Sequence, residues 1–238
     1  MDAVALAAQE ARLRIPTGIT GLDPLIQGGL QKGDFVLLMG DLGTGKTIFS
    51  AQFIYNSAKK FAEKAVYATF EEDLKSFKRN MARFGMDFES LEKEKLVKIM
   101  DLEALEGRGM GSNIEALLGA LDEIGARRLV IDSLTAFMSG AQEKFDYSFL
   151  MHLIYKTLKR EGVTTLVTVS RPQVAGSRET AVEEFVADGI FELRNYVSRD
   201  IELKTQFYIR KLRGTEHSRK YHSVLFTPTG MQILPYTH

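Results

Sequence analysis

GDLGTGKT, from Gly40 to Thr47, is the stretch of sequence that decides the fold of this chain. It satisfies the pattern G-x-x-x-x-G-K-[ST] of a phosphate-binding loop, or P-loop. The apolar run Phe35 to Met39 precedes it, and apolar residues at helical spacing follow Lys46. An apolar run that ends at glycine is expected of a strand covered on both faces. The sequence therefore predicts a buried strand, a P-loop and a helix in succession.

The residue types of this loop suit a polyphosphate. Glycines let the backbone curl until several N–H groups point inward at the start of a helix, which forms a nest for an anion. Lys46 would reach the β- and γ-phosphates, and the Thr47 hydroxyl would bind Mg²⁺. We therefore predict an ATP and Mg²⁺ site. The residues expected to contact the nucleotide are Gly40, Asp41, Leu42, Gly43, Thr44, Gly45, Lys46, Thr47 and Ile48.

A P-loop needs a second metal-binding group at the end of a neighbouring strand, and Asp132 is the candidate. It ends the apolar run in Arg128-Leu129-Val130-Ile131-Asp132-Ser133. Because Mg²⁺ keeps part of its hydration shell, we expect Asp132 to act on the metal through water. An apolar run that ends in aspartate is also common at the start of a helix. The P-loop in the same chain favours the metal role.

Helical spacing and short buried strands alternate over the rest of the chain to about residue 188. The predicted strands after the P-loop are 65–70, 128–132 and 164–169. Strands separated by amphipathic helices imply an α/β fold with a mainly parallel sheet flanked by helices on both faces. After residue 188 the strands follow one another directly, which predicts an antiparallel extension of the same sheet. We expect an N-terminal helical extension over 1–14 and one domain over 15–238.

Composition excludes several classes of protein. Lys plus Arg and Asp plus Glu both number 31 among 238 residues, and this zero net charge argues against a strongly basic nucleic-acid binder. The absence of cysteine excludes disulfides and thiolate metal sites. No run of 18 apolar residues occurs, so no membrane partner is predicted. With no signal-peptide pattern at the start, we expect a cytoplasmic protein.

Hydrolysis also requires a group that orients or deprotonates water, and Glu71 and Glu72 are the candidates. They follow the predicted strand 65–70. Side chains alternate along a strand, so the two glutamates should point to opposite sides. If this strand lies beside the P-loop strand, one carboxylate faces the γ-phosphate, as a general base must. The alternative is an acidic cap on the following helix, a role that suits Asp73.

Three stretches together resemble the KaiC family within the RecA/RadA superfamily. They are residues 16–47 (PTGITGLD through GGL to the P-loop), Phe70-Glu71-Glu72, and VEEFVADGIFELRN (182–195) followed by Lys211 to His217. The resemblance implies a RecA-like P-loop NTPase that hydrolyses ATP with paired catalytic glutamates. It also implies a homo-oligomeric ring, usually a hexamer, with ATP bound between subunits.

The resemblance further implies that Lys211 and Arg213 reach the nucleotide of the neighbouring subunit. The sequence allows this, because Phe207 and Ile209 would share a strand face with the two cations and anchor them. The alternative is a solvated basic hairpin end. Lys46, which the P-loop motif places at the β- and γ-phosphates, is also expected among the catalytic groups. In the family's phosphorylating half, adjacent hydroxyl residues accept phosphate. Glu184 and Phe185 occupy those positions here, so autophosphorylation is not expected.

Two other functions stay open on the sequence. Recombinase-like accessory proteins share this core and bind single-stranded DNA through two loops, which correspond here to about 136–146 and 171–183. These loops hold few cations, Lys144, Arg171 and Arg178, so support for a nucleic-acid partner is weak. The second alternative is a regulatory scaffold that binds ATP, turns it over slowly, and signals through a protein partner.

Overall fold

The computed structural model describes residues 14–70, 72–102, 110–134, 144–170 and 182–234. The strands are β1 (Arg14–Ile15), β2 (Leu30–Gln31), β3 (Phe35–Gly40), β4 (Ala65–Thr69), β5 (Val97–Asp101), β6 (Arg128–Asp132), β7 (Thr164–Ser170), β8 (Gly189–Val197), β9 (Leu203–Leu212), β10 (His222–Thr227) and β11 (Gly230–Ile233). The helices are η1 (Asp23–Ile26), α2 (Lys46–Phe61), α3 (Leu74–Ala82), α4 (Phe88–Lys93), α5 (Met110–Ile124), α7 (Lys144–Arg160) and α8 (Val182–Val186).

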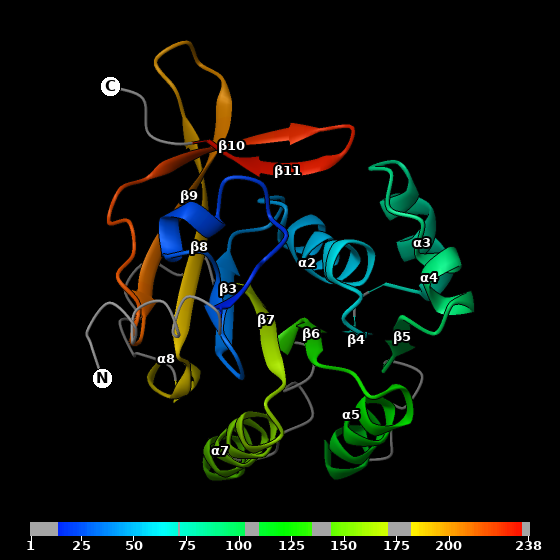
Figure 1. Ribbon diagram of the computed structural model, residues 1–238. Helices are drawn as coiled ribbons and strands as arrows, with labels where there is room; N and C mark the ends of the chain where they lie inside the picture. The colour runs from blue at the N-terminus through cyan, green and yellow to red at the C-terminus, as the bar shows by residue number, and fades with distance from the viewer. Residues whose placement is uncertain (1–13, 71, 103–109, 135–143, 171–181, 235–238) are drawn as a thin grey trace, which may run out of the picture.

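One large sheet forms the middle of the molecule (Figure 1). Its nine strands lie in the order β11-β10-β9-β8-β3-β7-β6-β4-β5, and β1 and β2 form a separate pair. All pairs from β8 across β3 to β5 are parallel, whereas β9, β10 and β11 are antiparallel. The predicted fold class is therefore confirmed. One detail differs, because β8 was assigned to the antiparallel tail and instead pairs in parallel with the P-loop strand β3.

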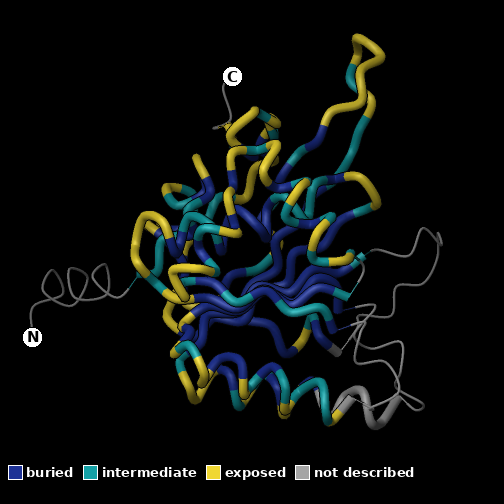
Figure 2. Tube along the Cα trace, turned by 90° about the vertical axis from the view of Figure 1, so that its right-hand side faces the viewer, coloured by how far each residue is buried: buried dark blue, intermediate teal, exposed yellow. Residues whose placement is uncertain are grey.

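Helices cover both faces of this sheet. Val36 and Leu38 of β3 belong to one apolar core with α2, α3 and α4, and Phe35, Leu37 and Met39 belong to another with α5 and α7. Burial on both faces explains why β3 reads as an uninterrupted apolar run. Figure 2 shows the strands as a buried layer between half-exposed helices. Within the described ranges, no helix is long and apolar enough to cross a membrane.

Arg14 is the first residue of the chain that the structure describes. The predicted extension over 1–14 lies outside the described residues except for Arg14, which pairs with Gln31 in the β1–β2 ribbon. The Arg14 guanidinium donates hydrogen bonds to Thr215 Oγ1 (2.6 Å) and Gln27 Oε1 (3.0 Å). Arg14 therefore packs with the domain and contacts the segment that follows β9.

Candidate nucleotide-binding site

The P-loop leaves the end of β3 and turns tightly into α2. Gly43 and Gly45 have φ angles of +75° and +89°, a left-handed conformation that favours glycine. A Cβ atom at Gly40 would lie 2.6 Å from Thr44 Oγ1 and 2.9 Å from the carbonyl oxygen of Leu193 on β8. The glycines of the motif are therefore required by the path of the backbone and by the close approach of β8.

Two side chains of the loop fold back over it. Lys46 Nζ donates to the carbonyl oxygens of Gly40 (2.8 Å) and Asp41 (3.0 Å), and Thr44 Oγ1 donates to Asp41 O (2.8 Å). Gly45 is the N-cap of α2 and supplies no side-chain cap, and the first turn carries no acidic residue. The first N–H groups of α2 and the Lys46 ammonium thus form a setting that suits an anion.

The next two residues of the motif begin α2. Thr47 and Ile48 are both half-buried, and the Thr47 carbonyl oxygen accepts a hydrogen bond from Ser50 Oγ (3.1 Å). Ile48 packs against the apolar core, whereas Leu42 at the tip of the loop is exposed. The predicted contact residues therefore form one continuous turn, with Thr47 at the beginning of the helix.

Asp132 ends β6 as predicted, and its carboxylate is buried and hydrogen-bonded on both oxygens. Tyr67 OH donates to Oδ2 (2.6 Å) and Thr168 Oγ1 donates to Oδ1. Burial, followed by the charge of Asp132, raises the pKa of Tyr67 well above its usual value, so the phenol stays neutral. Tyr67 OH also lies 3.1 Å from Ser50 Oγ, which links Asp132 to α2. Each carboxylate oxygen keeps a second lone pair for water.

Strand alternation does not place Glu71 and Glu72, for two reasons. Strand β4 does not lie beside β3, because β7 and β6 stand between them. The strand also ends at Thr69, so the alternation of its side chains does not extend to the glutamates. Glu71 lies outside the described residues.

Glu72 nonetheless lies in the turn next to Asp132. Phe70 N–H donates to the Asp132 carbonyl oxygen (2.9 Å), and Glu72 N–H donates to Thr69 Oγ1 (3.3 Å). The Glu72 carboxylate accepts a hydrogen bond from the Asn80 side chain on α3. The predicted capping role of the following residue, Asp73, is confirmed, because it accepts hydrogen bonds from backbone N–H groups in the first turn of α3.

The sequence predicts the strands of the β10–β11 hairpin but not their position against the P-loop (Figure 1). The buried Gln52 side chain of α2 donates to Met231 O (3.0 Å) and accepts from Met231 N–H (2.7 Å). This pair of bonds fixes β11 on α2. A Cβ atom added to Gly45 would lie 2.6 Å from the Phe226 ring and 2.8 Å from Met231 Cε. In the sequence, the only sign of this contact is that Gln52 lies among apolar residues of the predicted helix, where a buried amide needs a hydrogen-bond partner.

The strand face predicted for Lys211 and Arg213 is wrong. They do not share the face of Phe207 and Ile209, because β9 contains a bulge after Ile209 that shifts its register against β8. Leu212 continues the buried side of the strand instead. The two cations therefore leave the core face at the end of β9.

Both cations bind the last turn of α8. Lys211 Nζ donates to the carbonyl oxygens of Glu184 (2.9 Å) and Phe185 (3.4 Å). Arg213 donates from Nη2 to Phe185 O (2.7 Å) and from Nη1 to Val186 O (3.3 Å). Cations at a helix C-terminus satisfy carbonyl groups that have no partner within the helix.

This position is at the opposite edge of the sheet from the P-loop of the same chain. Leu212 pairs with Gly189, which pairs with Val36 near the start of β3. Gly40 lies four residues further along β3, which at about 3.3 Å per residue is roughly 13 Å. Figure 1 accordingly places α8 and the start of α2 at opposite ends of β3 and β8. The structure brings Lys46, Thr47, Asp132 and Glu72 to one edge and separates Lys211 and Arg213 from them.

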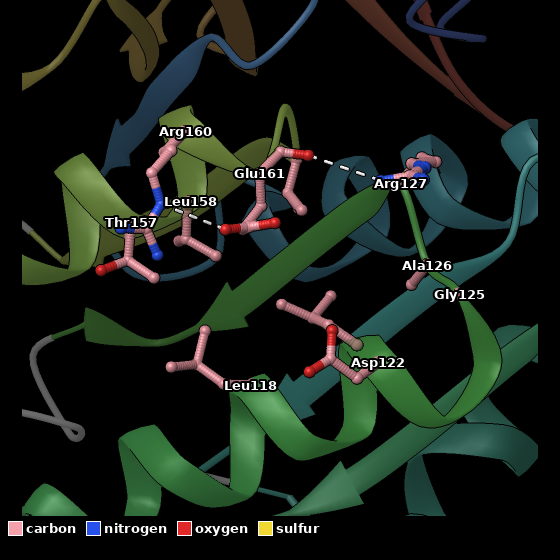
Figure 3. Close-up of a pocket in the computed structure, with 11 residues that line it drawn as sticks. Leu118, Asp122, Gly125, Ala126, Arg127, Thr157, Leu158, Arg160 and Glu161 are labelled. Carbon is pink, nitrogen blue, oxygen red and sulfur yellow. Dashed lines mark hydrogen bonds and ion pairs between the residues drawn. The ribbon is translucent and has the colours of Figure 1, made fainter.

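The loops weighed for DNA binding lie largely outside the described residues, which end at 134 and 170 and resume at 144 and 182. A hollow of about 410 Å³ lies elsewhere, between the C-terminal ends of α5 and α7 (Figure 3). It has an apolar floor, and its rim includes an ion pair between Arg160 and Glu161. Residues just before β6 and β7 line it, so it is at the edge of the sheet away from the P-loop.

A P-loop after a central strand, an aspartate at the end of a second parallel strand, and helices on both faces define the RecA-like class of P-loop ATPases. The particular family follows from comparison with known sequences. The sequence model of the KaiC ATPase family matches residues 15–238. The chain belongs to this family, and family membership supports ATP binding and ATPase activity.

Known proteins agree with this assignment. The chain is 34% identical over 238 residues to the circadian clock oscillator protein KaiC of Synechococcus elongatus, and 31% identical over 232 residues to the circadian clock protein KaiC2 of Synechocystis. The alignments include 95% and 94% of this chain but only 45% and 40% of those proteins. The chain therefore spans less than half the length of these relatives. The crystal structure of the KaiC-like protein PH0186 from Pyrococcus horikoshii matches with a TM-score of 0.83 and 36% identity, covering 93% of this chain and 99% of that one.

Proposed function

We propose that this protein hydrolyses Mg-ATP in a hexameric ring of identical subunits, with each nucleotide shared between two neighbours. One observation carries this proposal: a P-loop that turns around the Lys46 ammonium lies at the same sheet edge as the buried, hydrogen-bonded Asp132. The N–H groups at the start of α2 and the Lys46 charge would hold the phosphates. Asp132 would bind Mg²⁺ beside the phosphates, through water.

The oxygen groups at this edge fit magnesium. Mg²⁺ prefers hard oxygen ligands and keeps several waters, and the Thr47 hydroxyl and Asp132 carboxylate offer such oxygens. Within the described residues, no cluster of three acidic or histidine side chains could hold a metal alone, so the phosphates would supply further ligands. When bound, the ion would neutralise charge on the phosphate oxygens. The hydrogen bonds from Tyr67 and Thr168 fix the Asp132 carboxylate at the end of β6.

Glu72 and Glu71 are proposed to orient or deprotonate the attacking water. The turn that holds Glu72 contacts Asp132 through Phe70, so a carboxylate is available close to the proposed metal ligand. Asn80 holds the Glu72 side chain, which limits its freedom. A general base needs this kind of fixed position within reach of the water.

The remaining catalytic charge is proposed to come from a second copy of the chain. Lys211 and Arg213 lie at the edge of the sheet away from their own P-loop, so they could serve only the site of a neighbour. A cation delivered in this way stabilises charge on the transferring phosphoryl group and can raise the rate by about 10³–10⁵. The family resemblance of the segment from Lys211 to His217 supports the same arrangement.

The test is a mixing experiment between two inactive variants. Arg213→Ala should abolish most phosphate release, and so should the double variant Glu71→Gln, Glu72→Gln, while both keep Mg-ATP binding by calorimetry. Each active interface needs intact glutamates from one subunit and an intact Arg213 from its neighbour. In a random equal mixture of the two variants each requirement is met half the time, so about a quarter of the interfaces would be active. We therefore expect about a quarter of wild-type turnover. Mass measurement with and without Mg-ATP would give the ring size. Absence of any recovery in verified mixed rings would refute the shared site.

A further inference from the structure

Asp188 is a buried carboxylate at the junction between α8 and β8, outside the groups assigned above. Asp188 is only 3% exposed. Asp188 Oδ2 accepts from Phe35 N–H (3.1 Å) and from Lys159 Nζ (2.7 Å), and Oδ1 accepts from Tyr155 OH (3.2 Å). These contacts tie one carboxylate to the start of β3 and to the last turns of α7.

Asp188 also contacts Arg213 in two ways. The Asp188 carbonyl oxygen accepts from Arg213 N–H (2.8 Å), which fixes the backbone where β9 ends. The carboxylate oxygen Oδ1 lies 3.8 Å from Arg213 Nη1. This separation is long for an ion pair, because the carboxylate is already satisfied by Phe35, Lys159 and Tyr155. Asp188 therefore attracts the Arg213 guanidinium electrostatically but forms no short ion pair with it.

The other partners of the Arg213 side chain are neutral. Its guanidinium donates to the carbonyl oxygens of Phe185 and Val186, and half of the side chain (49%) is exposed. A phosphate would add full charge attraction and bidentate geometry to the guanidinium, which a neutral carbonyl group cannot supply. A phosphate could therefore replace the carbonyl partners, whereas a carboxylate in tight bidentate contact would compete with it. The arrangement orients the guanidinium and leaves it available.

We propose that Asp188 is a positioning residue that holds Arg213 in the orientation needed to reach the neighbouring subunit's nucleotide. This inference rests on the proposed function, in which Arg213 acts across the interface. Lys159 takes part by neutralising Asp188. Partial burial alone would lower the pKa of Lys159, but the hydrogen bond and charge of Asp188 outweigh it and the pKa is raised. The lysine therefore stays charged, and Asp188 does not need Arg213 as its main counterion.

The experiment is a double-mutant cycle on ATP turnover with Asp188→Asn and Arg213→Ala. Asparagine keeps the shape of the side chain and an acceptor for Phe35 N–H but removes the charge. We expect Asp188→Asn to lower kcat by about tenfold or more with little change in KM, since misplacing a catalytic group acts mainly on the transition state. In the Arg213→Ala background the same change should have no further effect on kcat.

A matched control is Asp34→Asn, because Asp34 is an equally buried carboxylate at the same edge that accepts a hydrogen bond from Gln31 N–H. Its kcat should equal that of wild type. Urea unfolding of every variant separates a loss of stability, which would be the same with and without Arg213, from a loss of positioning.

The outcomes separate a failure of the proposed function from a failure of the positioning role. If Arg213→Ala leaves kcat unchanged, the proposed function loses its shared cation and this inference falls with it. If Arg213→Ala lowers kcat but Asp188→Asn has no effect, or lowers kcat by the same factor in both backgrounds, the positioning role alone is overturned.

A second variant applies if Asp188→Asn does not fold. Lys159→Met removes the nearest cation of Asp188, and the lysine side chain is 43% exposed, so the fold should tolerate the change. The carboxylate should then draw Arg213 inward and lower kcat, with no effect in the Arg213→Ala background. An unchanged kcat in Lys159→Met would overturn the proposal.

Discussion

Replacing Gly45 with alanine is expected to destabilise the fold through the C-terminal hairpin as well as through the backbone. A left-handed conformation costs an alanine about 1–2 kcal/mol, and φ at Gly45 is +89°. The new Cβ atom would also lie 2.6 Å from the Phe226 ring and 2.8 Å from Met231 Cε. Overpacking of this kind costs about 1–3 kcal/mol. The sum is a loss of about 2–5 kcal/mol in the free energy of unfolding.

Gly43 supplies the matched control. Its φ is +75°, but a Cβ atom there would meet nothing within 4 Å. Gly43→Ala should therefore cost only the backbone part, about 1–2 kcal/mol. Urea unfolding without nucleotide, followed by circular dichroism, measures both variants, and Phe226→Ala in the Gly45→Ala background should recover part of the difference. Equal losses for the two alanines, within about 0.5 kcal/mol, would refute the idea that the hairpin packs on the P-loop.

Two further predictions concern buried polar groups. Tyr67→Phe removes a hydrogen-bond donor to the Asp132 carboxylate, so it should lower the free energy of unfolding in urea by about 2 kcal/mol and lower kcat. The control Tyr55→Phe should change neither quantity. If Tyr67→Phe also changed neither quantity, the hydrogen bond between Tyr67 and Asp132 would be contradicted. Burial raises the pKa of Asp34 from 3.8 to about 6. Between pH 3.8 and about pH 6 the folded state therefore keeps a proton on Asp34 that the unfolded state has lost, and the free energy of unfolding falls as the pH rises through this range. Asp34→Asn should therefore gain stability relative to wild type over this range, by at most about 3 kcal/mol, and a difference independent of pH would contradict the assignment.

Much of the fold could be predicted from local sequence because its signals are local. The P-loop has fixed spacing, and a buried parallel strand such as β3 is an apolar run. Asp132 could be found for the same reason, since it ends such a run. By contrast α4 and β5 were missed. Helix α4 is six residues long, too short for helical periodicity to stand out. Strand β5 lies at the end of the strand order and alternates buried with half-buried residues, so it is not an uninterrupted apolar run.

The errors at the site come from contacts between residues far apart in the chain. The order of strands places β6 and β7 between β4 and β3, and no local pattern around Glu72 contains that information. The bulge after Ile209 depends on pairing with β8. Tyr67 and Thr168 read as ordinary strand residues, and only the parallel register of three strands brings their hydroxyl groups to Asp132. Sequence periodicity describes burial well, but it does not describe which buried groups meet.

The topology of the sheet explains why one chain holds the two halves of the proposed site apart. Strand β8 runs parallel to β3, so both end at the P-loop edge. Strand β9 returns antiparallel to β8, and its end must therefore lie at the opposite edge, where Lys211 and Arg213 bind α8. No rotation of these side chains can cross the length of β3. In the proposed ring, catalysis would then require assembly, because the phosphates and the cations that act on them belong to different copies.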